Sequence, residues 1–175
     1  MSTNDTSIHI KLSKTSKKYA GKYTAIVDEI DSDLSMFNWT VAAPNRQYVK
    51  RTIGGRKNRK GIWMHREIME RMLGYPVPDG LLVDHINGDK LDNRRENLRL
   101  ATMSQNGMNR GKPKTNSSGY KGVYRHKQNE RWVANIQVNG NTIYIGSFDT
   151  PEDAHAAYCA AADLYHKEFK NYGDK

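Results

Sequence analysis

Cysteine is nearly absent from this chain of 175 residues, and long apolar runs are missing altogether. The one cysteine, Cys159, excludes a disulfide within the chain and a zinc site built from several cysteines. Its alanine-rich neighbours indicate a helix interior, where we expect a small buried side chain. No stretch approaches the roughly 18 apolar residues of a membrane span, and the first residues lack the pattern of a signal peptide. We therefore expect a cytoplasmic protein with no membrane partner.

Acidic residues are also in short supply. The chain has 19 Asp and Glu against 28 Lys and Arg, a formal net charge of +9, and an isoelectric point near 9.6. An excess of this size favours a polyanionic partner such as nucleic acid over the alternative of a merely soluble basic protein. We expect no small-molecule substrate. Hydrophobic residues make up 37% of the chain, so two small cores fit the composition better than one large core.

One short segment combines a candidate general base with oxygen ligands. Asp84-His85 precedes an Asn-Gly turn, and Asn97 and Asn106 follow His85 by 12 and 21 residues. Histidine suits the base role because its ordinary pKa, about 6.5, lies near the working pH. Asp84 alternates to the opposite side of the strand from His85, which is expected to face the attacking water. Asp84 and Asn106 therefore predict a site for one divalent ion, Mg²⁺ or Mn²⁺, since Zn²⁺ prefers more nitrogen and sulfur.

Two other features of this region need interpretation. The oxygen-bearing side chains from Asp84 to Asp92 suggest a calcium loop, which we reject because Ile86 stands where the third position needs a ligand. His65 either leans toward the site or is a structural histidine with its hydrogen bonds satisfied, which is the interpretation we prefer.

The order of elements around this segment follows from periodicity and turn residues. Met64, Ile68 and Met72 predict a helix that Gly74 ends. A strand over 81–83 leads into Asp84-His85, a return strand covers 98–101, and Thr102 or Ser104 caps a short helix bearing Asn106. Before residue 64, strands are predicted around 8–12, 23–27, 39–41, 48–49, 52–53 and 62–63, with a hairpin turn at Pro44-Asn45-Arg46.

A basic loop lies within this first block. From Arg46 to Lys60 there are seven basic residues and no acidic one. A hairpin tip of this kind suits phosphate contacts, and a solvated loop is an equally open interpretation. The DNA-contact candidates here are Arg51, Arg56 and Lys57.

Residues 64–108 resemble the HNH (ββα-metal) endonucleases, in particular the phage and intron-encoded homing type. The matching segments are Met64-His65-Arg66, Val83-Asp84-His85-Ile86-Asn87-Gly88-Asp89, Asn93-Arg94-Arg95-Glu96-Asn97-Leu98-Arg99 and Gln105-Asn106. The resemblance implies that His85 is the general base and that Asn97 braces the loop and His85. It implies that Asp84 and Asn106 hold one divalent metal ion, with products ending in a 3′-hydroxyl and a 5′-phosphate. Because Asn106 stands where the family often has histidine, magnesium or manganese is favoured over zinc or nickel.

The last block is compact and follows a basic linker at 109–118, where Arg110, Lys112 and Lys114 suit a DNA backbone. Strands are predicted over 120–125, 131–138 and 142–148, and a helix opens near Pro151. Its inner face is expected to be Ala154, Ala157, Tyr158, Ala161, Leu164 and Tyr165.

Residues 119–170 resemble the plant Apetala/ethylene-response-factor DNA-binding domain, which also occurs fused to homing nucleases. The matching residues are Gly119-Tyr120-Lys121-Gly122-Val123, Trp132-Val133-Ala134, Ile143-Tyr144-Ile145-Gly146-Ser147-Phe148-Asp149-Thr150, Glu152-Asp153-Ala154 and Ala157-Tyr158. The resemblance implies a three-stranded sheet that enters the major groove while the helix backs it. The family's contact positions on the first strand fall on Lys121, Tyr124 and His126.

Alternation assigns the faces of the other two strands. Trp132, Ala134, Ile136 and Val138 face the core, and so do Ile143 and Ile145. The DNA face then bears Arg131, Asn135, Gln137, Thr142 and Tyr144. Several plant arginines are replaced by neutral donors and acceptors here, so the plant target sequence does not carry over. Gln137 or Asn135 is a candidate to pair with adenine edges.

Together these patterns predict an α+β protein. Residues 1–63 form a β-rich basic lobe, 64–108 the ββα-metal unit, 109–118 a linker, and 119–175 a three-stranded sheet with one helix. The expected function is site-specific, metal-dependent cleavage of double-stranded DNA. One chain supplies one active site, so we expect a monomer, rather than a dimer, that nicks one strand. A non-catalytic DNA-binding regulator is the alternative. An RNA nuclease or RNA binder is a third, disfavoured because the A-form major groove is too narrow for such a sheet-and-helix domain.

Overall fold

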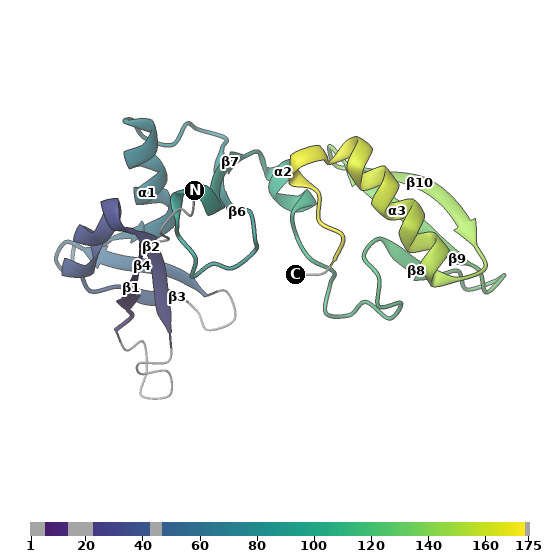
Figure 1. Ribbon diagram of the computed structural model, residues 1–175, viewed down its shortest axis with the longest axis horizontal. Helices are drawn as coiled ribbons and strands as arrows, with labels where there is room; N and C mark the ends of the chain where they lie inside the picture. The colour runs from purple at the N-terminus through teal and green to yellow at the C-terminus, as the bar shows by residue number, and fades with distance from the viewer. Residues whose placement is uncertain (1–5, 14–22, 43–46, 174–175) are drawn as a thin grey trace. The chain divides into compact units, whose positions relative to one another are not determined.

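The computed structural model describes residues 6–13, 23–42 and 47–173, and the chain divides into two compact units, Met1–Leu100 and Ala101–Lys175 (Figure 1). Each unit has hydrophobic clusters of its own, as the composition predicted. The division assigns the helix with Asn106 to the second unit. Within the described ranges, no helix is long and apolar enough to cross a membrane.

The first unit begins with two small antiparallel sheets. β1 (Ser7–Lys11) pairs with β2 (Thr24–Asp28), and a 3-10 segment, η2 (Glu29–Met36), follows. β3 (Thr40–Ala42), β4 (Tyr48–Ile53) and β5 (Lys60–Trp63) form a sheet in that order. These strands confirm the predicted ones, whereas the turn at 44–46 lies outside the described residues.

The second half of this unit supplies the elements of the motif. α1 (Met64–Leu73) ends at Gly74, whose φ of 77° is the left-handed cap that glycine favours. β6 (Leu82–His85), the 3-10 turn η3 (Arg95–Asn97) and β7 (Leu98–Ala101) follow, and β6 pairs with β7. Met64 and Ile68 are buried as expected, but Met72 is 42% exposed. A spacing of eight residues turns 80° away from the starting face, so Met72 leaves the buried stripe.

Both halves of the first unit share one core. Val27, Leu34, Trp39 and Val49 cluster with Met64 and Ile68. The backbone of Ile26 on β2 donates to Leu91 O at 2.8 Å and accepts from Asn93 N at 2.8 Å, so β2 holds the loop after β6. The N-terminal lobe and the motif therefore fold as one body.

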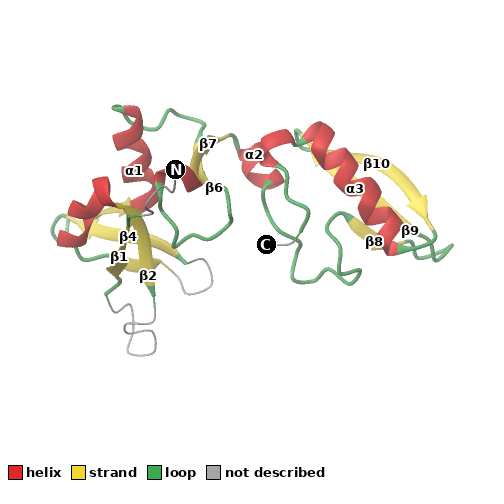
Figure 2. Ribbon diagram, viewed as in Figure 1, coloured by secondary structure: helices red, strands yellow, loops and turns green. Residues whose placement is uncertain are grey.

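The second unit is a helix packed on an antiparallel sheet. β8 (Val123–Arg125), β9 (Trp132–Val138) and β10 (Asn141–Phe148) lie in the order β10-β9-β8, and α3 (Pro151–Tyr165) covers one face (Figure 2). A short helix, α2 (Met103–Met108), precedes the sheet, and η4 (Lys167–Phe169) follows α3. This sheet and helix confirm the predicted C-terminal architecture.

The sheet's two faces follow the predicted alternation in part, because Val133, on the face opposite Ala134, is also buried. Ala134 and Ile136 are buried, Ile143 packs against the core, and Tyr144 is 62% exposed. The inner face of α3 differs in part, because Ala162 is buried whereas Leu164 is 66% exposed. The reason is geometric: six residues after Tyr158, Leu164 points about 120° away from that buried side chain. Tyr165, the last residue of α3, is 43% exposed. Cys159 is half-buried and packs against the same core.

Candidate active site

Asp84 and His85 end strand β6, and both side chains are buried. The His85 ring has no exposed surface, which differs from the expectation that it faces water. Its ring lies 5.2 Å from that of His65 on α1 and 6.0 Å from that of Tyr48 on β4, centroid to centroid. Three elements of the unit, β4, α1 and β6, therefore meet at this histidine.

Burial sets the protonation of both histidines. It lowers the pKa of His85 to about 4, with the Lys90 ammonium acting in the same direction. Burial likewise lowers the pKa of His65 to about 3, and His85 adds to the effect. Both rings are therefore neutral at pH 7. The His85 Nε2 lies 3.4 Å from Asn93 Oδ1, so a proton on Nε2 faces an acceptor and leaves the lone pair on Nδ1.

His65 does not match the preferred interpretation of a satisfied structural histidine. Its Nδ1 is buried and has no hydrogen-bond partner among the described residues. The ring is instead in tilted contact with Tyr48, at 5.3 Å, and with His85. His65 therefore forms part of the wall around His85.

Arg99 is a site residue that the motif analysis missed. Its Nε and Nη2 donate to the Asp84 Oδ2 at 3.1 and 3.0 Å, and the two side chains are 15% and 2% exposed. Arg99 comes two residues after Asn97, on the return strand β7. Because β7 pairs with β6, the predicted pairing of these two strands could have indicated that Arg99 lies near Asp84. The pair compensates a carboxylate that would otherwise be costly to bury.

Asn97 closes the loop that follows His85. Its Oδ1 accepts from the Asn87 backbone N at 2.9 Å, and its Nδ2 donates to Asp92 O at 2.7 Å. Its own carbonyl accepts from Ile86 N at 2.8 Å. One side chain thus bonds to both ends of the loop from Asn87 to Asp92, the arrangement a bracing residue requires.

The metal-ligand residues suit a hard cation by their chemistry. No group of three or more His, Cys, Asp or Glu side chains suited to a metal ion was found in the described part of the chain. A carboxylate from Asp84 and an amide oxygen from Asn106 are the donors that Mg²⁺ and Mn²⁺ prefer, completed by phosphate and water. Asn106 lies on α2 in the second unit, and its pairing with Asp84 stays a prediction.

The basic residues of the first unit divide into two kinds. Arg51 is 16% exposed, its Nη2 is 3.0 Å from the Glu67 carboxylate, and its guanidinium lies 3.9 Å from the Phe37 ring. These contacts hold β4 to the rest of the unit, and a DNA contact of Arg51 stays a prediction. Arg56 and Lys57 are exposed in the β4–β5 loop.

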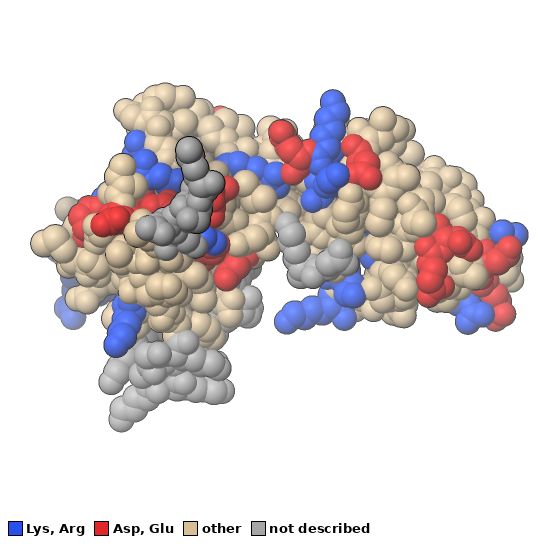
Figure 3. Space-filling view, viewed as in Figure 1, with Lys and Arg blue, Asp and Glu red and all other residues tan. Residues whose placement is uncertain are grey.

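The predicted DNA face of the second unit is largely open. Tyr124, Gln137, Thr142 and Tyr144 are exposed, His126 and Asn135 are half-buried, and Asn135 Oδ1 has no hydrogen-bond partner among the described residues. Arg131 is 46% exposed and reaches Asp149 at 3.2 Å. On the face shown in Figure 3, acidic and basic side chains appear on both units, so charge alone does not mark a DNA surface there.

The predicted linker is attached to the second unit. Lys112 Nζ donates to Gly119 O at 2.8 Å, and Asn116 Nδ2 donates to Tyr120 O at 2.8 Å. Lys121 Nζ donates to Met108 O at 2.7 Å and Asn171 O at 3.1 Å, whereas Arg110 is exposed. These contacts differ from those of a free tether, because polar side chains of the segment bond the neighbouring backbone.

Family models match two separate segments of the chain, and the first match runs past Leu100 to include α2. A family model described as HNH endonuclease matches residues 63–108, and a model described as AP2 domain matches residues 118–168. Both matches confirm the resemblances drawn from the motifs.

Individual relatives cover different shares of the chain. Protein 3.8 of Escherichia phage T7 is 33% identical over 108 residues, which are 62% of this chain and 88% of that protein. The protein named uncharacterized HNH endonuclease L560, of Acanthamoeba polyphaga mimivirus, is 37% identical over 61% of this chain and 54% of its own length. The AP2-like ethylene-responsive transcription factor CRL5 of Oryza sativa subsp. japonica is 41% identical over 39% of this chain and 10% of its own length. The chain thus spans most of the first relative, about half of the second and a small part of the third.

Proposed function

The chain belongs to the HNH endonucleases and has an AP2 domain after its nuclease motif, and from this premise we propose that it is a site-specific, metal-dependent DNA endonuclease of the homing type. The observation that supports the proposal most directly is the neutral, buried His85, placed beside the Arg99-compensated Asp84 and followed by a loop that Asn97 closes. A protein that only binds DNA has no chemical need for this set.

His85 acts as the general base in the proposed reaction. With its Nε2 proton directed at Asn93 Oδ1, Nδ1 accepts the proton of the water that attacks the phosphorus. Because the ring is buried, DNA must displace covering side chains, Tyr48 among them, before that water reaches His85. The bond between phosphorus and O3′ then breaks to leave a 5′-phosphate, and the departing O3′ takes a proton from solvent to become a 3′-hydroxyl.

The remaining residues prepare the charge and shape of the site. Asp84 and Asn106 would hold one Mg²⁺ or Mn²⁺, which when bound would offset the charge on the phosphate. Arg99 keeps the Asp84 carboxylate oriented, and Asn97 keeps the loop after His85 in place.

The C-terminal sheet selects the site in this proposal. Its exposed face would enter the major groove of duplex DNA, with Gln137 and Tyr144 facing the bases. A monomer with one active site would nick one strand. Lys and Arg side chains of the first unit, Arg56 and Lys57 among them, would contact phosphates without regard to sequence.

Plasmid nicking tests the proposal. Supercoiled plasmid bearing a target site is incubated with the protein and Mg²⁺ or Mn²⁺, beside chelator and His85→Ala controls. Conversion to open circles that needs the metal and falls at least a hundredfold in the variant is the expected result. Tight binding to a site found by selection, without cleavage under any divalent ion, would instead favour a non-catalytic regulator. Cleavage of RNA duplexes in preference to DNA would favour the RNA nuclease.

A further inference from the structure

Helix α2 is too short to be stable alone. It spans six residues, Met103–Met108, and its first turn is closed by a capping box between Thr102 and Gln105. Isolated helices below roughly 12 residues are marginal in water even with good caps. Contacts from outside must therefore hold α2, and the structure shows those contacts at its C-terminal end.

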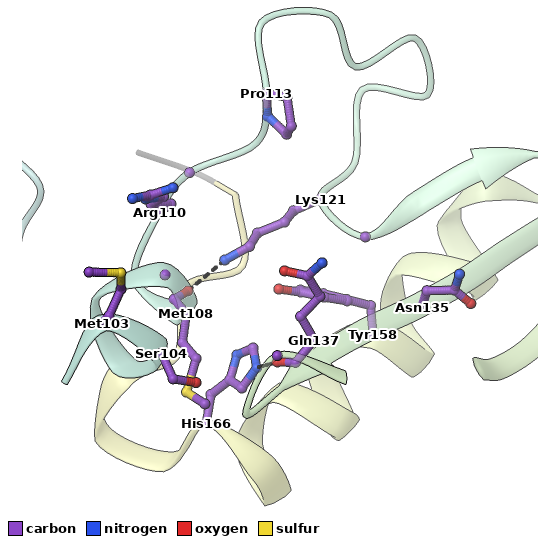
Figure 4. A pocket seen from close by; sticks show the side chains of 14 residues that line it. Met103, Ser104, Met108, Arg110, Pro113, Lys121, Asn135, Gln137, Tyr158 and His166 are labelled. Carbon is purple, nitrogen blue, oxygen red and sulfur yellow. Dashed lines mark hydrogen bonds between the residues drawn. The ribbon is translucent and has the colours of Figure 1, made fainter. Parts of the chain in front are cut away.

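Lys121 makes the first of these contacts. Its Nζ donates to the carbonyl of Met108, the last residue of α2, at 2.7 Å, and to Asn171 O at 3.1 Å. A cation at this end of a helix also complements the unpaired carbonyls there. Figure 4 shows the Lys121 side chain reaching toward Met108 across a cavity of about 570 Å³, which Gln137 and Tyr158 also line.

Asn171 makes the second contact and is 3% exposed. Its Nδ2 donates to Asn109 O at 2.7 Å, and its Oδ1 accepts from Gly173 N at 2.7 Å. Its own carbonyl lies 3.4 Å from the Tyr158 hydroxyl, which donates to it from α3. This asparagine therefore connects the end of α2 to the helix that backs the sheet.

Apolar packing adds a third contact in the same place. Ala101, Met108 and Phe169 form a small cluster in which all three side chains are buried. Phe169 belongs to η4, directly after α3. The segment from η4 to Gly173 thus passes along α2 and fixes it to the sheet-and-helix body by both polar and apolar contacts.

We infer that Lys121 and Asn171 are positioning residues whose hydrogen bonds fix α2 to the rest of the second unit, so that this unit, rather than a free tether, orients Asn106. We call these hydrogen bonds of Lys121 and Asn171 the clasp. The inference rests on the proposed role of Asn106 as a metal ligand. It gives a positioning role to the segment 167–173, which belongs neither to the predicted DNA face nor to the nuclease motif. It also gives Lys121 an internal partner where plant relatives were expected to have a DNA contact.

The contacts of Lys121 and Asn171 make metal binding depend on the folded second unit. α2 held by the reader has its last turn fixed, so Asn106 is ordered in the full chain. A released α2 would fray, and a frayed ligand lowers metal affinity because its ordering must accompany binding.

Hydrogen exchange on the full-length protein tests the clasp without relying on cleavage. Asn171→Asp removes the donor to Asn109 O, adds a negative charge and keeps the acceptor for Gly173 N. Its matched control is Asn116→Asp, which makes the same change of charge where Nδ2 bonds Tyr120 O. Lys121→Met, controlled by Lys112→Met, provides a second variant. We expect the amides of Asn106, Asn109 and Arg110 to exchange at least tenfold faster in both clasp variants and unchanged in both controls.

A second readout separates positioning from loss of folding. The Mn²⁺ concentration for half-maximal nicking should be several-fold higher for Asn171→Asp than for Asn116→Asp. The two variants should bind the selected DNA site with equal affinity. Unchanged exchange in α2, or equal acceleration throughout β9, would overturn the clasp. If the wild-type protein cleaves nothing while the exchange result holds, the clasp stands and the proposed nuclease function fails.

Discussion

Arg99 donates two hydrogen bonds to one carboxylate oxygen of Asp84, from Nε at 3.1 Å and from Nη2 at 3.0 Å. The pair joins β7 to β6 beside the proposed general base. Its geometry places a fixed positive charge next to the carboxylate that is proposed to hold the metal. The guanidinium thus compensates Asp84 in the metal-free protein, and a bound cation would share that task.

Replacing Arg99 by methionine should destabilise the metal-free protein. Removing the charged partner of a carboxylate that is 2% exposed costs up to about 3–5 kcal/mol of unfolding free energy. Mn²⁺ should then raise the melting temperature of the variant more than that of the wild type, since the ion supplies the missing charge. Thermal melts with Mn²⁺ and with chelator measure this. Arg66→Met, which breaks the exposed pair with Glu70, should cost below about 1 kcal/mol, and an equal cost for both variants would contradict the prediction.

His65 should make stability depend on pH. Its pKa is lowered by burial to about 3 in the folded protein, from an ordinary 6.5. Between these values the unfolded chain binds the extra proton, so the free energy of unfolding falls as the pH falls, by up to about 1.4 kcal/mol per pH unit. Above pH 6.5 the contribution is complete. Urea unfolding at pH 7, 6, 5 and 4 measures the free energy of unfolding against pH. Its slope should be shallower for His65→Gln than for the wild type, because the two proteins share every other titratable group. Equal slopes would refute this.

Asn97→Ala should loosen the loop after His85. The change leaves the Asn87 N–H and the Asp92 carbonyl without their side-chain partner, at a cost of about 1–3 kcal/mol. Nicking should slow by about ten- to hundredfold, as for other residues that orient a site. Asn97→Asp keeps the acceptor for Asn87 N and should lose less. Asn38→Ala, at an exposed position, serves as the control, and a full cleavage rate in Asn97→Ala would show that the loop needs no brace.

Site choice should depend on the exposed face of the sheet. Tyr144→Ala or Gln137→Ala should weaken binding to the selected site by about 1–3 kcal/mol, or roughly 5- to 150-fold. Metal-dependent nicking of non-target plasmid should stay largely intact. Leu164 on α3 is 66% exposed, so Leu164→Ala should change neither the affinity for the selected site nor the nicking of non-target plasmid. Competition binding and plasmid assays measure the two effects. Loss of metal-dependent cleavage itself in Tyr144→Ala or Gln137→Ala would refute this division between reading and cutting.

Two glycines of the second unit allow the cost of backbone strain to be distinguished from the cost of steric overlap. Gly122 has φ +73°, and a Cβ there would lie 2.3 Å from the Tyr158 ring and 2.7 Å from Asn135 O. Gly140 has φ +83° with nothing within 4 Å. Gly140→Ala should therefore cost about 1 kcal/mol, and Gly122→Ala about 2–5 kcal/mol. Urea unfolding of the two variants should differ accordingly, and equal losses would mean that Tyr158 moves aside without cost.

Local pattern predicted the elements because their causes are local. The alternation of Ile8, Ile10 and Leu12, the Asn139-Gly140 turn and Thr150 before Pro151 all act over a few residues. β1, the β9–β10 hairpin and α3 appear where these signals place them. Where spacing was extrapolated along a whole helix, at Met72 and Leu164, it was wrong, because 3.6 residues per turn drifts from a strict four-residue spacing in α1 and from a strict three-residue spacing in α3.

The sequence by itself determined the chemistry: a histidine after an aspartate, asparagines at set distances, and a second domain of the AP2 type. Only the tertiary structure decided what surrounds these residues. It buried His85 under His65 and Tyr48, and it set Arg99 against Asp84. It fastened α2 through Asn171, 62 residues beyond the Asn109 carbonyl that it bonds. Burial, pKa and ion pairing depend on groups brought together from distant parts of the chain, and no pattern of neighbouring residues specifies them.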